Sequence, residues 1–218
     1  MKKLSRKNLL QVAIEFGLSI RNERRHPFQV CRLCCMLFDE LQSLHHMGNT
    51  ERIWLQAAAL LHDVGKSICG RDHNKKSRDI IIKSTKLPLD KKERIIIGLT
   101  ARYHRGALPN RNHRTYGRLD CESRYYVRKL AALLRFADGL DENHRSPVTG
   151  LSCQISEDNI IVCPETEGPF NSQKAIAKAD LLEDVLNRKV ILIEQLEPVF
   201  PSNEIESTDD LDYTDVQQ

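Results

Sequence analysis

The chain has 218 residues, of which 40% are hydrophobic and 29% are charged, the balance of a globular protein with one main domain and an appended piece. No apolar run approaches the ~20 residues that span a bilayer. The basic N-terminus leads into an amphipathic stretch and not into an apolar signal core, so we expect a cytoplasmic protein without a membrane segment.

The net charge of +3 is unevenly distributed. Residues 201–218 contain six acidic residues and no Lys or Arg, which leaves 33 basic against 24 acidic residues, or +9, on residues 1–200. A basic body suits an anionic ligand such as phosphate or nucleic acid. Charge alone is equally consistent with a solvated basic surface.

The seven cysteines form an odd set without the spacing of a disulfide framework. Cys31, Cys34 and Cys35 lie in a helical apolar pattern, and a single Cys-x-x-Cys is a weak zinc signal. We therefore expect core thiols in a reducing compartment.

Most of the first 145 residues have the apolar spacing of helices. The expected helices cover about residues 30–44, 53–64, 77–84, 91–104 and 120–139. Asp90, with Glu93 three residues later, is close to a capping box and marks the start of the fourth. Gly and Pro residues within 105–117 predict a loop.

The pattern changes after about residue 146. Apolar runs at 151–155 and 160–163 flank a polar turn, which predicts a β-hairpin. The spacing predicts one helix over 175–196, and the acidic segment 201–218 is predicted to be disordered. The chain thus divides into a helical domain (1–146), a small α+β subdomain of hairpin and helix (147–200) and a tail (201–218), and its fold class is mainly α.

Several polar residues stand where apolar ones are expected. His62 and Asp63 end an Ala- and Leu-rich helix, and Asp138 lies in a similar apolar run. Burying a carboxylate costs several kcal/mol unless it is paired or binds a metal. His26 precedes one amphipathic helix and His104 ends another. His and Asp together suit a divalent metal of intermediate hardness, so four helices that deliver these side chains to one point would make a metal site.

Each of these residues has a plainer interpretation. A single helical His is more often structural than a ligand, and a single buried Asp is often a cap or the partner of an arginine, such as Arg135 for Asp138. Because adjacent residues on a helix point about 100° apart, His62 and Asp63 could share one ion only at the edge of their helix. The residues alone leave both interpretations open.

The order His26…His62-Asp63…Asp138 resembles the His-Asp (HD) superfamily of metal-dependent phosphohydrolases. Five local sequences resemble one branch of it, the HD-type C-terminal region of the exopolyphosphatase / guanosine pentaphosphate phosphatase family. They are His-Pro-Phe-Gln-Val (26–30), Cys-Met-Leu-Phe-Asp-Glu-Leu (35–41), Ala-Ala-Leu-Leu-His-Asp-Val-Gly (58–65), Ala-Arg-Tyr-His-Arg (101–105) and Leu-Leu-Arg-Phe-Ala-Asp-Gly-Leu-Asp (133–141). The likeness covers roughly residues 8–197. We expect the HD region alone, without the actin-like ATPase-fold half of full-length relatives.

The resemblance implies an HD-type helical bundle whose metal ligands are His26, His62, Asp63 and Asp138. The ion would be divalent, with Mn, Mg, Fe and Zn as candidates. Asp63 and His104 would be the catalytic residues, His104 facing the substrate, lying behind the ligands or binding a second ion. His73 begins a stretch that is His-rich in relatives, but here Asn74 and Lys76 replace two histidines, which weakens a second metal site.

Three hypotheses for function follow. The first is a metal-dependent phosphohydrolase acting on a nucleotide, a guanosine polyphosphate or polyphosphate, and a homodimer is a candidate assembly. The residues expected to face substrate phosphate are Lys66, His73, Lys75, Lys76, Arg102, Arg105 and His144, against the alternative of solvated helix faces. The second is a non-catalytic module that binds polyphosphate or a nucleotide. Nucleic acid ranks last as a partner, because the few aromatic residues form no stacking platform.

Overall fold

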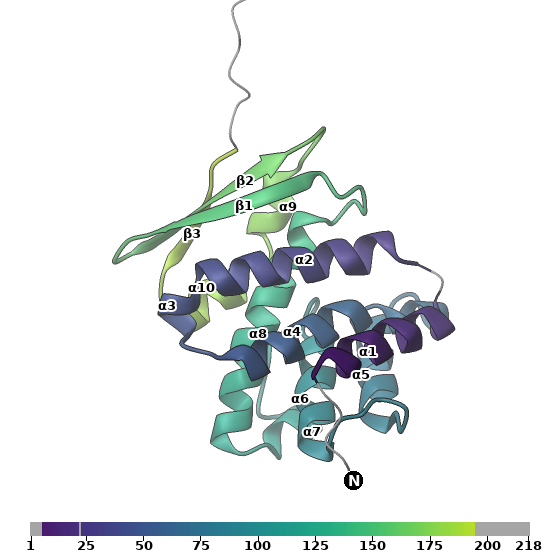
Figure 1. Cartoon of the computed structure of the whole chain (residues 1–218). Helices are drawn as coiled ribbons and strands as arrows, with labels where there is room; N and C mark the ends of the chain where they lie inside the picture. The colour runs from purple at the N-terminus through teal and green to yellow at the C-terminus, as the bar shows by residue number, and fades with distance from the viewer. Residues whose placement is uncertain (1–5, 22, 195–218) are drawn as a thin grey trace, which may run out of the picture.

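The computed structural model describes residues 6–21 and 23–194 and is mainly helical (Figure 1). The helical part of the described residues begins with seven segments. They are α1 (Arg6–Ile20), α2 (Arg25–Glu40), α3 (Gln42–His45), α4 (Asn49–Leu61), the 3₁₀ turn η1 (Val64–Ser67), α5 (His73–Lys83) and α6 (Lys91–Arg102). The short α7 (Arg114–Gly117) and the long α8 (Cys121–Leu140) complete the helical part. The predicted mainly α class is confirmed.

The core forms where α4 and α8 are enclosed by their neighbours. Every residue of α4 from Ala57 to Leu61 is buried, as is every residue of α8 from Leu130 to Leu140. A helix that is apolar on all sides must lie inside a protein, and α2, α4, α6 and α10 all pack on α8. The polar residues in these two helices therefore lie inside the molecule.

Local signals account for the helix boundaries. The Asp90 carboxylate accepts a hydrogen bond from the backbone N–H of Glu93 at 2.8 Å, and the Glu93 carboxylate accepts one from the N–H of Asp90 at 2.9 Å. This is the predicted capping box. The segment predicted as a loop after α6 contains only the one-turn helix α7.

The C-terminal part contains a three-stranded sheet in the order β1-β2-β3. β1 (Val148–Ile155) and β2 (Asn159–Thr166) form the predicted hairpin, with strands longer than expected. α9 (Ser172–Ile176) and α10 (Asp180–Leu186) follow it. The sheet lies across α2 in Figure 1, and β1 contacts α2.

The prediction of one helix over 175–196 is wrong. α10 ends at Leu186, and Asn187 adopts a left-handed conformation with φ 51°. The chain then forms β3 (Lys189–Leu192), which pairs in parallel with β2. Branched residues in this segment favour a strand, and Val190 becomes buried. The subdomain is thus a hairpin, two short helices and a third strand.

The division of the chain after residue 146 stays a prediction. The acidic segment 201–218 lies outside the described residues. Within the described part, no helix has the length and apolar character needed to cross a bilayer. The cysteines of this part are all free thiols.

Candidate metal centre

The expected ligands come together because they all lie at helix ends. His26 is the second residue of α2, and Asp138 lies in the last turn of α8. α4 ends at Leu61, so His62 and Asp63 lie just beyond the helix, where the backbone turns into η1. This turn removes the geometric objection to two adjacent ligands. His73 begins α5, and His104 lies two residues beyond the end of α6.

One half of the cluster joins His26, His62 and Asp138. The Nε2 atoms of the two imidazoles are 3.2 Å apart. Oδ1 of Asp138 lies 3.2 Å from Nε2 of His26 and 3.5 Å from Nε2 of His62. All three side chains are nearly inaccessible to solvent. This group has the size and donor set of a metal site.

The other half joins Asp63, His73 and His104. Oδ1 of Asp63 lies 3.1 Å from Nε2 of His73 and 3.8 Å from Nε2 of His104, and these two nitrogens are 3.4 Å apart. Oδ2 of Asp63 points toward the first half, 3.6 Å from Nε2 of His62. The Asp63 carboxylate therefore links the two halves, one oxygen to each.

The backbone fixes which imidazole nitrogen faces the cluster. Nδ1 of His62, His73 and His104 each lies 2.7–2.8 Å from the carbonyl oxygen three residues earlier. A carbonyl can only accept, so Nδ1 carries the proton and the Nε2 of each neutral ring offers a lone pair. Lone pairs that meet at 3.2–3.4 Å repel unless a cation or a proton lies between them.

His26 is oriented by a carboxylate. Its Nδ1 lies 2.8 Å from Oδ2 of Asp141, whose Oδ1 accepts a 2.6 Å hydrogen bond from the backbone N–H of Ser146. A carboxylate behind a metal-binding imidazole fixes its tautomer and raises its basicity. The ring of His144 stacks on His26 with centroids 3.6 Å apart.

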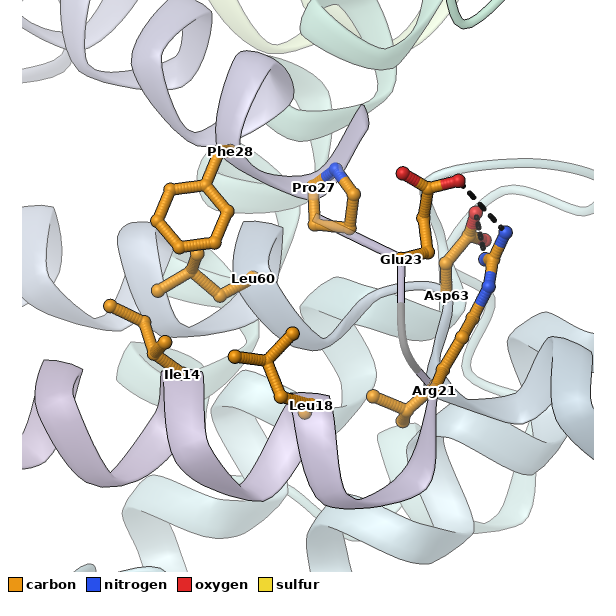
Figure 2. Close-up of a pocket in the computed structure, with 10 residues that line it drawn as sticks. Ile14, Leu18, Arg21, Glu23, Pro27, Phe28, Leu60 and Asp63 are labelled. Carbon is orange, nitrogen blue, oxygen red and sulfur yellow. Dashed lines mark hydrogen bonds and ion pairs between the residues drawn. The ribbon is translucent and has the colours of Figure 1, made fainter. Parts of the chain in front are cut away.

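Three basic side chains contact the two carboxylates of the cluster. Lys66 and Arg21 both approach Oδ2 of Asp63, and Arg21 lies 3.3 Å away. Figure 2 shows Arg21 bridging Asp63 and Glu23. Lys178 contacts Oδ2 of Asp138 at 2.7 Å. The carboxylate charge is thus partly offset by these cations. On Asp63 they contact the same oxygen that faces His62, and on Asp138 Lys178 contacts the oxygen that faces away from the imidazoles.

The same neighbours shift the pKa values of the cluster. Burial alone would lower the pKa of His26, but the carboxylates of Asp138 and Asp141 raise it to about 9. Burial lowers the pKa of His104 to about 3. Despite burial, the surrounding imidazoles hold the pKa of Asp63 and of Asp138 well below the usual range of a carboxyl group. Both carboxylates are therefore ionised and His104 is neutral at pH 7.

These residues fit a divalent cation. Oδ1 of Asp63 is buried and makes no hydrogen bond with acceptable geometry among the described residues. Leaving such an atom unsatisfied is costly, and a metal would satisfy it together with the imidazole lone pairs. Nitrogen and oxygen donors of this kind suit Zn, Fe or Mn. His26, His62, Asp63 and Asp138 would hold one ion, and Asp63, His73 and His104 could hold another.

The basic residues predicted to face substrate are only partly near the cluster. Lys66, His73 and His144 contact its members. Lys75 and Lys76 are exposed on α5, and Lys75 pairs with Asp72.

The other two, Arg102 and Arg105, lie at the end of α6 and three residues beyond it. The Arg105 side chain is exposed. Arg102 lines a different pocket, described below. Asn74 stands where relatives have a histidine. Its side chain donates a hydrogen bond to the backbone carbonyl of Arg102 at 2.9 Å and so connects α5 to the end of α6.

Sequence reasoning missed Arg21, Asp141 and Lys178. A signal existed for Asp141, a second acid three residues after Asp138 at the end of the same apolar helix. Arg21 and Lys178 lie 42 and 40 residues from the carboxylates they contact, and nothing local distinguishes them from surface residues. Arg135, the alternative partner of Asp138, pairs instead with Asp180 at 2.7 Å.

An apolar pocket borders the cluster at Asp63. Figure 2 shows Leu18 of α1 and Phe28 of α2 on its walls, and Ile14, Pro27, Leu60 and Val64 also line it. Phe28 is 42% exposed. The centre is thus flanked by an apolar surface on one side and by Lys66 and Arg21 around Asp63.

Fold and site define a class: a helical protein with a buried His/Asp cluster suited to a divalent cation, an arrangement compatible with the HD superfamily. A family model described as Ppx/GppA phosphatase, domain III, matches residues 13–185, and the chain belongs to this family. No curated protein matches the chain.

Proposed function

We propose that this chain is a cytoplasmic, metal-dependent phosphohydrolase. The observation that supports the proposal most strongly is the convergence of four imidazole Nε2 atoms and two carboxylates within hydrogen-bond to ion-pair distances, with each Nδ1 held by a carbonyl or a carboxylate. A purely structural cluster would have its nitrogens and oxygens paired with one another. Here Asp63 Oδ1 makes no hydrogen bond among the described residues, and its neighbour at 3.1 Å is the Nε2 atom of His73, which in the neutral tautomer held by the Gly70 carbonyl is also an acceptor.

A bound divalent ion would supply Lewis acidity toward a phosphoryl oxygen and would acidify water. His26, His62, Asp63 and Asp138 would hold it. Lys66 and Arg21 would offset negative charge on the phosphoryl group, as preorganised cations do in other phosphoryl-transfer sites. His104, neutral and buried, would face the substrate as proton acceptor or bind a second ion together with His73.

The substrate class follows from the family. Ppx/GppA membership favours polyphosphate or guanosine polyphosphate. The apolar pocket at Phe28 and Leu60 has a volume of only about 20 Å³, which is too small for the base of a nucleotide. The proposed substrates are therefore a nucleotide, a guanosine polyphosphate or polyphosphate, without a preference among them.

The test is phosphate or pyrophosphate release by the full chain, loaded with Mn²⁺ or Mg²⁺, from a panel of nucleotides, guanosine polyphosphates and polyphosphate. Asp63→Ala should abolish release and weaken metal binding. Asp39→Ala removes an exposed carboxylate of α2 that pairs with Arg52 and should leave both unchanged. A metal-loaded protein that is inert toward the whole panel would refute the enzymatic proposal.

A non-catalytic binding module is the second candidate. Lys66, Arg21 and Lys178 already offset the carboxylate charges, and the replacement of two histidines by Asn74 and Lys76 removes donors. Calorimetry distinguishes the two functions, because binding of a guanosine polyphosphate without turnover, lost in Asp63→Ala, supports a binding module.

A further inference from the structure

A second pocket lies where α5, the end of α6 and α7 meet. It is lined by Arg78 of α5, by Arg102 and Tyr103 at the end of α6, and by His113, Arg114 and Tyr116 around α7, with a volume of about 450 Å³. Volumes of this order are typical of small-molecule sites. Neither Asp63 nor any other member of the metal cluster lines it.

The residues that line the pocket carry a net positive charge. Three guanidinium groups and one imidazole line it, and no Asp or Glu does. Arg78 pairs with Asp79 at 2.6 Å, whereas Arg102 has no ion pair among residues 6–21 and 23–194. The wider sequence context agrees, because residues 94–119 contain six arginines and no acidic residue.

The charged form of Arg102 is destabilised by its partly buried position. Burial lowers the pKa of its guanidinium, and the Arg78 charge acts in the same direction, while Asp79, the partner of Arg78, partly offsets that charge. A partly buried guanidinium without an ion pair is stabilised by an anion beside it. The guanidinium fork matches phosphate oxygens and can bond them in pairs.

The walls of the pocket are preorganised. Tyr103 is fully buried and Tyr116 is 3% exposed. The hydroxyl of Tyr103 lies 2.9 Å from Nδ1 of His113, and the Arg102 guanidinium lies over the Tyr103 ring, 5.4 Å from its centroid. With the hydroxyl as donor, neutral His113 carries its proton on Nε2, which adds another hydrogen-bond donor. These contacts limit the side-chain entropy that a bound anion would cost.

We propose that this pocket is an anion site for a phosphate or diphosphate group, separate from the Asp63 cluster. The group could be free phosphate or pyrophosphate, or the diphosphate of a nucleotide. Arg102 and His104 lie two residues apart at the end of α6, so the segment that holds the anion also positions a member of the metal cluster.

The test is calorimetric titration of the full chain in excess EDTA and about 0.15 M salt, where no metal contributes and diffuse charge effects are screened. Phosphate, pyrophosphate and guanosine diphosphate are titrated separately. We expect saturable binding of pyrophosphate. Tighter binding of pyrophosphate than of the nucleotide identifies the free anion as the ligand, and the reverse order identifies a nucleotide diphosphate. Because metal is absent, the result does not depend on the proposed phosphohydrolase activity.

Two variants and one control locate the site. Arg102→Gln should weaken pyrophosphate binding about 10-fold or more, the usual effect of losing a charged hydrogen-bond donor. Arg114→Gln, at an exposed residue, should weaken it in the same direction with little risk to folding. Arg118→Gln is the matched control, an exposed arginine of the same segment that does not line this pocket.

The proposal is overturned if pyrophosphate does not bind, or if it binds folded Arg102→Gln and Arg114→Gln as tightly as the wild type. It is also overturned if Arg118→Gln weakens binding as much as the two pocket variants. That last result would describe a diffuse basic surface of the kind that nucleic acid uses.

Discussion

Replacing Asp141 by Asn tests whether His26 is a metal ligand, without touching any ligand atom. Asp141 is completely buried, with one oxygen on Nδ1 of His26 and the other on the backbone N–H of Ser146. Asn has almost the same shape, so the substitution leaves no cavity. It replaces one acceptor oxygen by an NH₂ group that can only donate.

Neither orientation of the new amide satisfies both neighbours. With its oxygen toward Ser146, the NH₂ group donates to Nδ1 of His26, and the neutral imidazole must then carry its proton on Nε2, where the lone pair is needed for the metal. With its oxygen toward His26, the NH₂ group meets the N–H of Ser146, donor against donor. Loss of such a carboxylate usually weakens metal binding 10–100-fold, or by about 1.4–2.7 kcal/mol.

The assay is calorimetric titration of the chelated, refolded protein with Mn²⁺ or Zn²⁺, with circular dichroism and thermal unfolding in EDTA as folding controls. Asp39→Asn, which neutralises an exposed carboxylate on the same helix as His26, should bind metal like the wild type. A folded Asp141→Asn protein with unchanged metal affinity would refute the argument that Asp141 fixes the tautomer of a ligand.

Part of the candidate site could be predicted because polar residues within apolar helices are visible in a sequence. His62, Asp63 and Asp138 interrupt apolar runs, and buried carboxylates must be paired or bind a metal, so the sequence indicated that these side chains meet other polar groups inside the protein. The capping box at Asp90 was equally visible, because it depends on two residues three positions apart.

The remaining features depend on contacts between distant segments. Helical and strand patterns coincide over the short apolar run of β3, and pairing with β2 decided the outcome. Arg102 and His104 are close in sequence. Arg102 was predicted to face substrate phosphate, and His104 to face the substrate, lie behind the ligands or bind a second ion. α6 ends at Arg102, and the structure places His104 in the cluster and Arg102 in the second pocket.

Two further predictions concern stability. The Asp138 and Asp141 carboxylates raise the pKa of His26 from 6.5 to about 9. In EDTA, protonated His26 therefore adds to the free energy of unfolding in full below pH 6.5, and this stabilisation is lost as the pH rises through 9. The difference in unfolding free energy between the wild type and His26→Gln, measured in urea, should therefore shrink by about 3 kcal/mol between pH 6 and 10. A difference that does not change with pH would contradict this. A Cβ on Gly65 would lie 2.2 Å from the carbonyl oxygen of His73, whereas a Cβ on Gly70 has no atom within 4 Å. Gly65→Ala should cost about 1–3 kcal/mol and weaken metal binding, because α5 must move away and take His73 with it. Gly70→Ala should stay within about 0.5 kcal/mol of the wild type, and equal unfolding midpoints for the two variants would show that η1 and α5 are not packed this closely.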